Sequence, residues 1–168
     1  MTELILRKAI VIDLGNVEHL YKSVIGQIGC AWNEKYPSAE DIMNDYNAGC
    51  LYVFSNKYQT IGAVSVVPEN ELDDIDYWTI KDGTHKEIAR VVISPSFQGK
   101  GYSKKMLLQL FSILSAQGCK AIHLLVSKEN PAAINLYKAL GFCFLGECYR
   151  YEHSYFICEK ELIIFIKQ

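Results

Sequence analysis

The stretch HKEIARVVISPSFQGKGYSKKMLLQLFSILSAQ, residues 85–117, decides the fold and contains the first functional signal. Its apolar run ending at Ile93 predicts a strand, and a helix is predicted from about Ser103 to Gln117. The apolar stripe of this helix consists of Met106, Leu107, Leu110, Phe111 and Leu114. Between strand and helix lies a glycine-containing loop from Gln98 to Ser103. Because the first N–H groups of a helix lack partners within it and lie at the positive end of its dipole, the loop is predicted to bind an anion, most often a phosphate.

The predicted strand has apolar residues on both faces, which is typical of a central strand. If no bulge interrupts it, one face is made of Glu87, Ala89, Val91 and Ile93. The opposite face is then made of Ile88, Arg90 and Val92. A second apolar strand, Ala121 to Val126, follows the helix, and a strand–helix–strand unit of this kind implies a right-handed parallel crossover. The two strands are therefore expected to lie side by side.

A helix and a hairpin are predicted after these two strands. Asn130 is placed to cap the helix, and Pro131 occupies its first position, where a missing N–H costs nothing. Gly141 is expected to end the helix. The runs Phe142–Tyr149 and Ser154–Ile164 then predict the two arms of a β-hairpin.

The N-terminal part begins with a short predicted strand, Leu4–Arg7. A helix follows, with apolar residues at helical spacing over 17–28. Either Asp13 or Asn16 is expected to cap this helix, and Gly29 is expected to end it.

A second helix is predicted to run to about Ala48, because Ser38 and Asp41 have nearly the spacing and chemistry of a capping box. The β-rich runs Leu51–Ser55 and Thr60–Val67 then predict an antiparallel hairpin. The chain is thus expected to read strand, two helices, three strands, helix, strand, helix and two strands.

The composition is that of an ordinary globular protein. The 168 residues fit one domain, 1–168, with a sizeable core. A net charge of -2 argues against nucleic acid, and no apolar run approaches the roughly 20 residues that span a membrane. The six scattered cysteines form no CxxC pair and no signal-like segment precedes them, which favours free thiols in a cytoplasmic protein. Cysteine and histidine are not clustered, so no metal is expected.

Two spaced patterns together carry a resemblance. The first is Ile93-x-Pro95-x-x-Gln98-x-x-Gly101-x-Ser103, and the second is Asn130-x-x-Ala133-x-x-x-Tyr137-x-x-x-Gly141-Phe142. Either pattern alone is weak, but both, in this order of elements, resemble the signature segments of the GNAT superfamily of acyl-CoA-dependent N-acyltransferases. The implied fold is α/β (α+β), a mixed, mostly antiparallel seven-stranded sheet with a central splayed parallel pair. One departure is Ser103, where the family usually has glycine or alanine.

The resemblance implies acetyl-CoA, or a close relative, as the cofactor. Its pyrophosphate would be bound by the loop residues Gln98, Gly99, Lys100, Gly101, Tyr102 and Ser103, although Lys100 could equally be a solvated loop residue. Its pantetheine arm would pair with the backbone of Val91, Val92 and Ile93 like an added strand. Asn130, Ala133 and Tyr137 would contact the same arm from the other side.

The chemistry needs an amine that is neutral, whereas an alkylamine with a pKa of about 10.4 is mostly protonated at pH 7. Glu87 is the candidate base, directly or through water, because some family members carry a catalytic glutamate there; the alternative is a surface carboxylate at a strand end. The resemblance places the Tyr137 hydroxyl beside the cofactor sulfur, as the candidate acid. A backbone N–H of residues 91–93 is a plausible oxyanion donor. Transfer is direct, so no cysteine nucleophile is needed.

The amine acceptor is the least determined feature. Trp32, Tyr36 and Glu87 are the candidate acceptor-binding residues, since an aromatic pair in a linker between helices needs a packing partner or a ligand. The aspartates of the long connection from Glu69 to Gly83 could bind a cationic amine, but a solvated loop is favoured for them.

Three functions stay open at this point: acetylation of a small-molecule amine, acetylation of a protein N-terminus as in ribosomal-protein acetyltransferases, and a non-catalytic acyl-CoA sensor. The presence of both Glu87 and Tyr137 argues against the sensor. The apolar tail Leu162–Ile166 fits either a strand extension or the contact of a homodimer.

Overall fold

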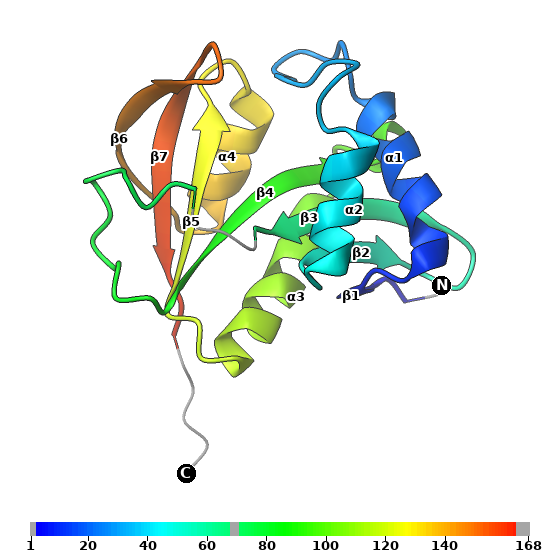
Figure 1. Cartoon of the computed structure of the whole chain (residues 1–168), viewed down its shortest axis with the longest axis horizontal. Helices are drawn as coiled ribbons and strands as arrows, with labels where there is room; N and C mark the ends of the chain where they lie inside the picture. Colours follow the sequence, from blue (N-terminus) through cyan, green and yellow to red (C-terminus); the bar gives the residue numbers. More distant parts are fainter. Residues whose placement is uncertain (1–2, 68–70, 164–168) are drawn as a thin grey trace.

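One sheet forms the centre of the computed structural model, which describes residues 3–67 and 71–163 (Figure 1). Within these residues the sheet has seven strands in the order β1-β2-β3-β4-β5-β7-β6. The strands are Ile5–Lys8 (β1), Leu51–Ser55 (β2), Thr60–Val66 (β3), His85–Ile93 (β4), Ala121–Ser127 (β5), Cys143–Arg150 (β6) and His153–Glu161 (β7). Neighbours are antiparallel except β4 and β5, which are parallel. The predicted fold class is confirmed.

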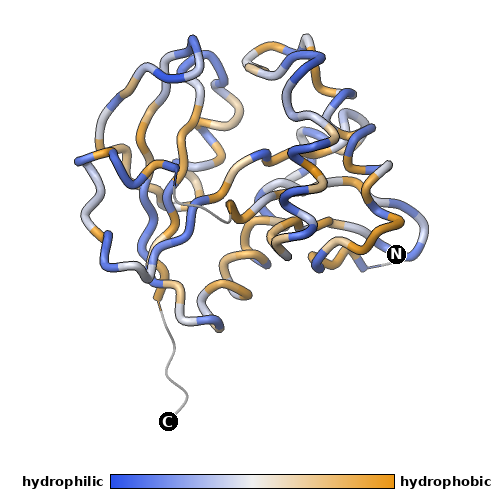
Figure 2. The backbone as a smooth tube through the Cα atoms, viewed as in Figure 1, coloured by the Kyte–Doolittle hydropathy of each residue, from blue (hydrophilic) through white to orange (hydrophobic). Residues whose placement is uncertain are grey.

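Helices cover both faces of the sheet. They are Leu14–Ser23 (α1), Ala39–Asn47 (α2), Tyr102–Ala116 (α3) and Pro131–Ala139 (α4). The predicted stripe of α3 is fully buried with residues of α4 against one face, while α1 and α2 pack on the other. Hydrophobic residues accordingly concentrate in the strands and in α3, whereas hydrophilic residues recur along 71–83 and at the β6–β7 turn (Figure 2).

The parallel pair is splayed, as predicted. β4 and β5 are paired only at the start of β4, where His85 lies opposite Ala121 and Glu87 opposite His123. β5 then continues along β7, and β4 continues along β3, so the two strands diverge (Figure 1). The backbone edge of β4 that faces β5 therefore has no partner strand over 88–93 among the described residues.

The expected alternation of side chains along β4 is wrong, because a bulge interrupts the strand. Ala89 pairs with Ser65 and Val92 with Ala63, so Arg90 and Val91 together face one residue of β3. Arg90 has a φ of 53°, in the left-handed region. A bulge adds one residue and reverses the faces beyond it.

The reversal is visible in the packing of β4. Ile88 and Ile93, which simple alternation would place on opposite faces, both pack with α3, and Val91 packs against the same cluster. Val92 packs instead with the residues of α1 and α2. Glu87 and the pair Val91 and Ile93 therefore do not share a face.

The start and end of α1 also differ from the prediction. Neither Asp13 nor Asn16 caps α1 with its side chain; the Asp13 carboxylate instead accepts hydrogen bonds from Arg7 at 2.7 and 3.0 Å. α1 ends at Ser23 and not at Gly29, which leaves Ile28 on the surface, 93 % exposed.

The second helix agrees with its capping signal, since the Ser38 hydroxyl accepts the Asp41 N–H at 3.1 Å and the Asp41 carboxylate accepts the Ser38 N–H at 2.7 Å.

Of the apolar tail, Leu162 is buried and Ile163 is exposed, and the remainder lies outside the described residues. The structure does not test the homodimer.

Candidate functional site

The loop between β4 and α3 has an open backbone. Gly99 and Gly101 have φ values of 72° and 79°, which glycine adopts without a steric penalty. A Cβ built at either position would meet no heavy atom within 4 Å. The Lys105 N–H donates to the Gly101 carbonyl at 3.1 Å in the first turn of α3, so the N–H groups that precede it point out of the helix start. This geometry suits the predicted pyrophosphate.

Two side chains of the loop are turned back onto the protein. Lys100 Nζ donates to the Ser96 carbonyl at 3.0 Å and lies over the Phe97 ring. Gln98 Nε2 donates to the Ile93 carbonyl at 3.0 Å. These bonds hold both side chains against the protein, so the backbone N–H groups of the loop are the ones available to bind an anion.

The connection between α1 and α2 touches both signature segments. Gln27 Oε1 accepts a hydrogen bond from Gln98 at 3.2 Å. Gly29 lies so close to the start of α4 that a Cβ built on it would be 2.6 Å from Asn130 Cα. Residues 27–29 therefore join the loop before α3 to the N-terminus of α4.

Two of the α4 residues have defined contacts within the protein. Asn130 Oδ1 accepts the Ala133 N–H at 3.0 Å, which confirms Asn130 as the N-cap. Tyr137 is 6 % exposed and its ring packs edge-on against Phe142, with centroids 5.3 Å apart. Burial raises the pKa of the Tyr137 phenol well above its ordinary value, so the hydroxyl stays protonated and able to donate at neutral pH.

Glu87 is a buried carboxylate and not a surface residue, since it is 6 % exposed. Its Oε2 accepts the Leu72 N–H at 3.2 Å. Burial, with the nearby charges of Glu71 and Asp73, raises the pKa of Glu87 to about 7, although the Leu72 N–H and Arg90 act in the opposite direction. A general base is most effective when its pKa lies near the working pH, so this environment suits a base.

Glu87 and Tyr137 come from opposite faces of the sheet. Glu87 contacts the segment 71–83, which packs through Leu72 and Trp78 on the face opposite α4. Tyr137 packs in the cluster under α3 and α4. Glu87 is the last residue of β4 that pairs with β5, directly before the backbone of 88–93, which has no partner strand on this edge within the described residues.

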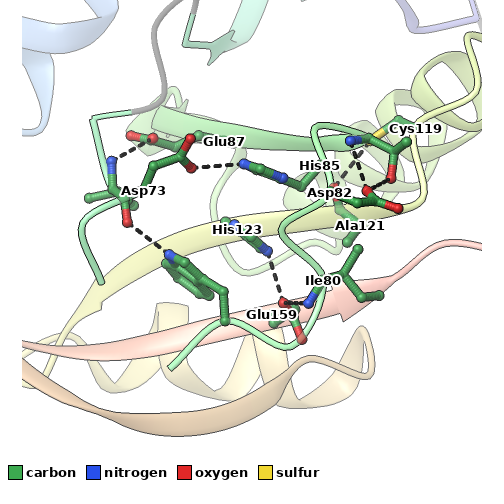
Figure 3. Close-up of polar contacts among 12 residues, drawn as sticks. Asp73, Ile80, Asp82, His85, Glu87, Cys119, Ala121, His123 and Glu159 are labelled. Atoms are coloured by element: carbon green, nitrogen blue, oxygen red, sulfur yellow. Dashed lines mark hydrogen bonds and ion pairs between the residues drawn. The ribbon is translucent and has the colours of Figure 1, made fainter. Parts of the chain in front are cut away.

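Three stacked aromatic rings lie next to Glu87 (Figure 3). His123 lies between Trp78 and His85, with ring centroids 4.0 and 4.5 Å away. His123 Nε2 contacts Glu159 Oε2 and His85 Nε2 contacts Asp73 Oδ1, both at 2.8 Å. Both Nδ1 atoms are buried without a hydrogen-bond partner in the described structure.

The charges of this stack are shifted by their surroundings. Burial and the neighbouring His85 lower the pKa of His123. Burial acts to raise the pKa of Glu159, but hydrogen bonds from Thr79, Ile80 and His123 lower it overall. A neutral histidine beside an ionised carboxylate is therefore favoured at this position.

Both aromatic candidates for the acceptor have contacts within the protein. Trp32 packs edge-on against Tyr21 of α1, with centroids 5.2 Å apart, and so finds the packing partner that an aromatic linker residue needs. The Tyr36 hydroxyl accepts a hydrogen bond from Arg90 Nη1 at 3.1 Å. Tyr36 is 40 % exposed, so part of it is available to a ligand.

Sequence reasoning missed several residues around Glu87. The solvated-loop interpretation suits Asp76, which is exposed, but Asp73 contacts His85 and Asp74 pairs with Arg150. A usable signal was present for His85, because His85 and Glu87 are two positions apart on one strand and so share a face. Nothing local indicated His123.

Within 3–67 and 71–163, no cluster of three or more histidine, cysteine, aspartate or glutamate residues could hold a metal ion. No helix in this part of the chain is long and apolar enough to cross a membrane.

Comparison with known proteins gives a family match over residues 17–142, to the model described as the acetyltransferase (GNAT) family. Among curated proteins, the spermine/spermidine N(1)-acetyltransferase of Bacillus subtilis (strain 168) is 44% identical over 59 residues, which are 34% of this chain and 39% of that protein. The [ribosomal protein bS18]-alanine N-acetyltransferase of Haemophilus ducreyi is 38% identical over 52 residues, 31% of this chain and 36% of that protein. These matches span less than half of the length of either relative.

Among solved structures, a GNAT family acetyltransferase from Streptococcus agalactiae superposes with a TM-score of 0.82 at 17% identity. The superposition covers 96% of this chain and 97% of that one. At this identity the likeness concerns the fold alone.

Proposed function

The chain belongs to the GNAT family of acetyltransferases, and from this premise we propose that it is an N-acetyltransferase that moves an acetyl group from acetyl-CoA directly to a primary amine of a small molecule. One observation carries the proposal. Glu87, a buried carboxylate with a pKa of about 7, lies at the last paired position of β4 before that strand diverges from β5.

The residues that would hold acetyl-CoA fit an extended, phosphorylated molecule. The open backbone at Gly99 to Ser103 and the start of α3 would take the pyrophosphate. The unpaired edge of β4 at Val91 to Ile93 would take the amides of the pantetheine arm as an added strand. When bound, acetyl-CoA supplies an activated thioester.

The chain's own groups would then control protons. Glu87, as a carboxylate, removes a proton from the acceptor ammonium and leaves a neutral amine that can attack. The Tyr137 hydroxyl donates a proton to the departing thiolate, for which its buried and protonated state is suited, and takes the second proton of the attacking nitrogen, so that it ends protonated. A backbone N–H of residues 91–93 donates to the oxygen that becomes negative during attack.

The acceptor side is lined by acidic and aromatic groups, which favours a cationic amine. The charges of Glu71 and Asp73 both act on Glu87, and Tyr36 and Tyr151 belong to the same region through Arg90 and Glu71. The similarity to a spermine/spermidine acetyltransferase supports a small amine.

A second candidate is acetylation of a protein N-terminus. The similarity to the bS18-alanine acetyltransferase favours it. In that case a peptide backbone, and not an alkyl chain, would lie along the region of Tyr36 and Tyr151.

A thiol-release assay with acetyl-CoA tests both candidates together. The panel contains polyamines, amino acids, aminoglycosides and short peptides with free N-termini, and mass spectrometry identifies each product. Release with small amines supports the first candidate, and a mass increase restricted to peptides supports the second. If calorimetry shows acetyl-CoA binding but no acceptor releases thiol, both are overturned in favour of an acyl-CoA sensor.

A further inference from the structure

Each turnover of the proposed reaction must dispose of one proton. The acceptor enters as an ammonium ion and leaves as a neutral amide, while the thiolate takes up one of the two protons that nitrogen loses. The other proton is left on Glu87. Because Glu87 is 6 % exposed, a neighbouring group with more access to water would pass this proton to solvent faster than Glu87 itself.

Asp73 occupies the place such a group requires. The Leu72 N–H bonds the Glu87 carboxylate at 3.2 Å, and Asp73 is the next residue in the chain. The Asp73 carboxylate contacts His85 Nε2 at 2.8 Å, and His85 lies two positions before Glu87 on β4. Figure 3 shows the Asp73 carboxylate between Glu87 and the His85 ring.

Asp73 also differs from Glu87 in its access to water. Its side chain is 48 % exposed, whereas the His85 side chain that holds it is 3 % exposed. His85 is itself fixed by its stack on His123. Asp73 therefore joins a rigid, buried site to solvent.

We propose that Asp73, held by His85, is the proton exit of Glu87. The O–H bond on Glu87 breaks, a new O–H bond forms on Asp73, and the Asp73 carboxyl releases the proton to water and regains its charge. No redox partner or further reactant is needed, and both carboxylates return to their starting states. Asp73 acts through Glu87, so it is a positioning and proton-transfer residue and not a catalytic one.

The charged and titratable groups around this pair come from each element packed on it. They are Glu71 from the segment that carries Asp73, His85 and Arg90 from β4, His123 from β5 and Tyr151 from the β6–β7 turn. The Asp73 charge acts to raise the pKa of Glu87, which is consistent with two carboxylates close enough to influence a shared proton.

The test replaces Asp73 with asparagine, which keeps an oxygen for the His85 N–H but does not accept the proton. Asp76→Asn is the matched control, because Asp76 is an exposed aspartate of the same segment. The turnover number is measured in dilute buffer and again with increasing imidazole at constant ionic strength. Imidazole is a small proton acceptor that can carry the proton to solvent when the Asp73 carboxylate is missing.

The inference rests on the proposed function, so wild-type turnover is established first. We expect Asp73→Asn to lower kcat roughly 100-fold in dilute buffer, the lower end for a positioned proton-transfer group, and imidazole to restore it, while Asp76→Asn changes neither. Wild-type kcat in Asp73→Asn, or a loss that imidazole does not restore, overturns the proton exit alone. An inactive wild type overturns the proposed function and the exit together.

Discussion

Arg90 and Asp45 form a buried ion pair that ties the bulge of β4 to α2. Arg90 Nε donates to Asp45 Oδ2 at 2.9 Å, and Arg90 Nη2 donates to Asp45 Oδ1 at 2.8 Å. The two side chains are 12 % and 4 % exposed. Arg90, whose backbone is in the left-handed region, is thus held in the bulge by a bidentate contact with Asp45, 45 positions earlier in the chain.

Asp45→Ala should lower the free energy of unfolding by about 3–5 kcal/mol, because it leaves the Arg90 guanidinium buried without a counter-charge. Denaturant unfolding followed by circular dichroism measures the loss. Glu18→Ala is the control, since Glu18 pairs with Lys22 at 2.8 Å on the surface of α1 and should change the midpoint little. Equal effects of the two substitutions would contradict the role given to the buried pair.

Glu87→Gln should lower kcat/KM by roughly 100-fold or more, because glutamine does not accept the ammonium proton. In the wild type, kcat/KM should fall as pH decreases through about 7, where the base becomes protonated. Initial rates between pH 5.5 and 9 measure this acidic limb, the part of the pH profile in which kcat/KM falls. A wild-type profile without a limb near pH 7 would show that another group, or water, is the base.

The raised pKa of Glu87 also predicts how stability depends on pH. Between the ordinary pKa of 4.5 and about 7, the folded state holds a proton that the unfolded state has released, so stability falls as pH rises through this window. The stability of the wild type relative to Glu87→Gln should decrease by about 3 kcal/mol from pH 4 to 8. Parallel urea titrations at both pH values measure the difference, and a constant difference would contradict the burial of an ionising Glu87.

Tyr137→Phe should lower kcat by roughly 100-fold, since it removes the proposed proton donor, while acetyl-CoA affinity changes little because the buried ring remains. Steady-state rates give kcat, and calorimetry gives the dissociation constant. Tyr58→Phe is the control, because Tyr58 is 73% exposed beside the β2–β3 turn. An unchanged kcat in Tyr137→Phe would remove this hydroxyl from the mechanism.

Gly29→Ala should weaken acetyl-CoA binding on the order of tenfold, about 1.4 kcal/mol. The new Cβ would lie 2.6 Å from Asn130 Cα, and backbone must shift to relieve the clash at the start of α4. Gly118→Ala is a matched control, since its φ of 85° is close to the 82° of Gly29 but its Cβ would meet nothing within 4 Å. Calorimetry should find a weaker complex only for Gly29→Ala.

Local signals accounted for the features that depend on neighbours in sequence. Asn130 was predicted as a cap and Ser38 with Asp41 as a capping box, because each such bond joins residues three positions apart. The stripe of α3 was predicted from its period, which reports only which side of a helix is buried.

The predictions that were wrong are those in which a contact with another element overrode a local preference. Asp13 has the chemistry of a cap, but its carboxylate accepts hydrogen bonds from Arg7 of β1 and from the Ile10 N–H, and none from the first turn of α1. Alternation along β4 was a sound default, yet the pairing with β3 inserts an extra residue at Arg90. The sequence of β4 has no glycine to mark that bulge.

The order of elements and the loop before α3 follow from local sequence signals, since apolar period, caps and glycines act over a few residues, and the splay of the parallel pair follows from the family resemblance. In contrast, no local signal indicated that Glu87 is buried, that its pKa is raised, or that Asp73 lies beside it and contacts His85. These properties depend on how the segment 71–83 packs across β4, β5 and β7. A proton's affinity for a carboxylate is set by the water and charges around it, and those are brought together only when distant parts of the chain meet.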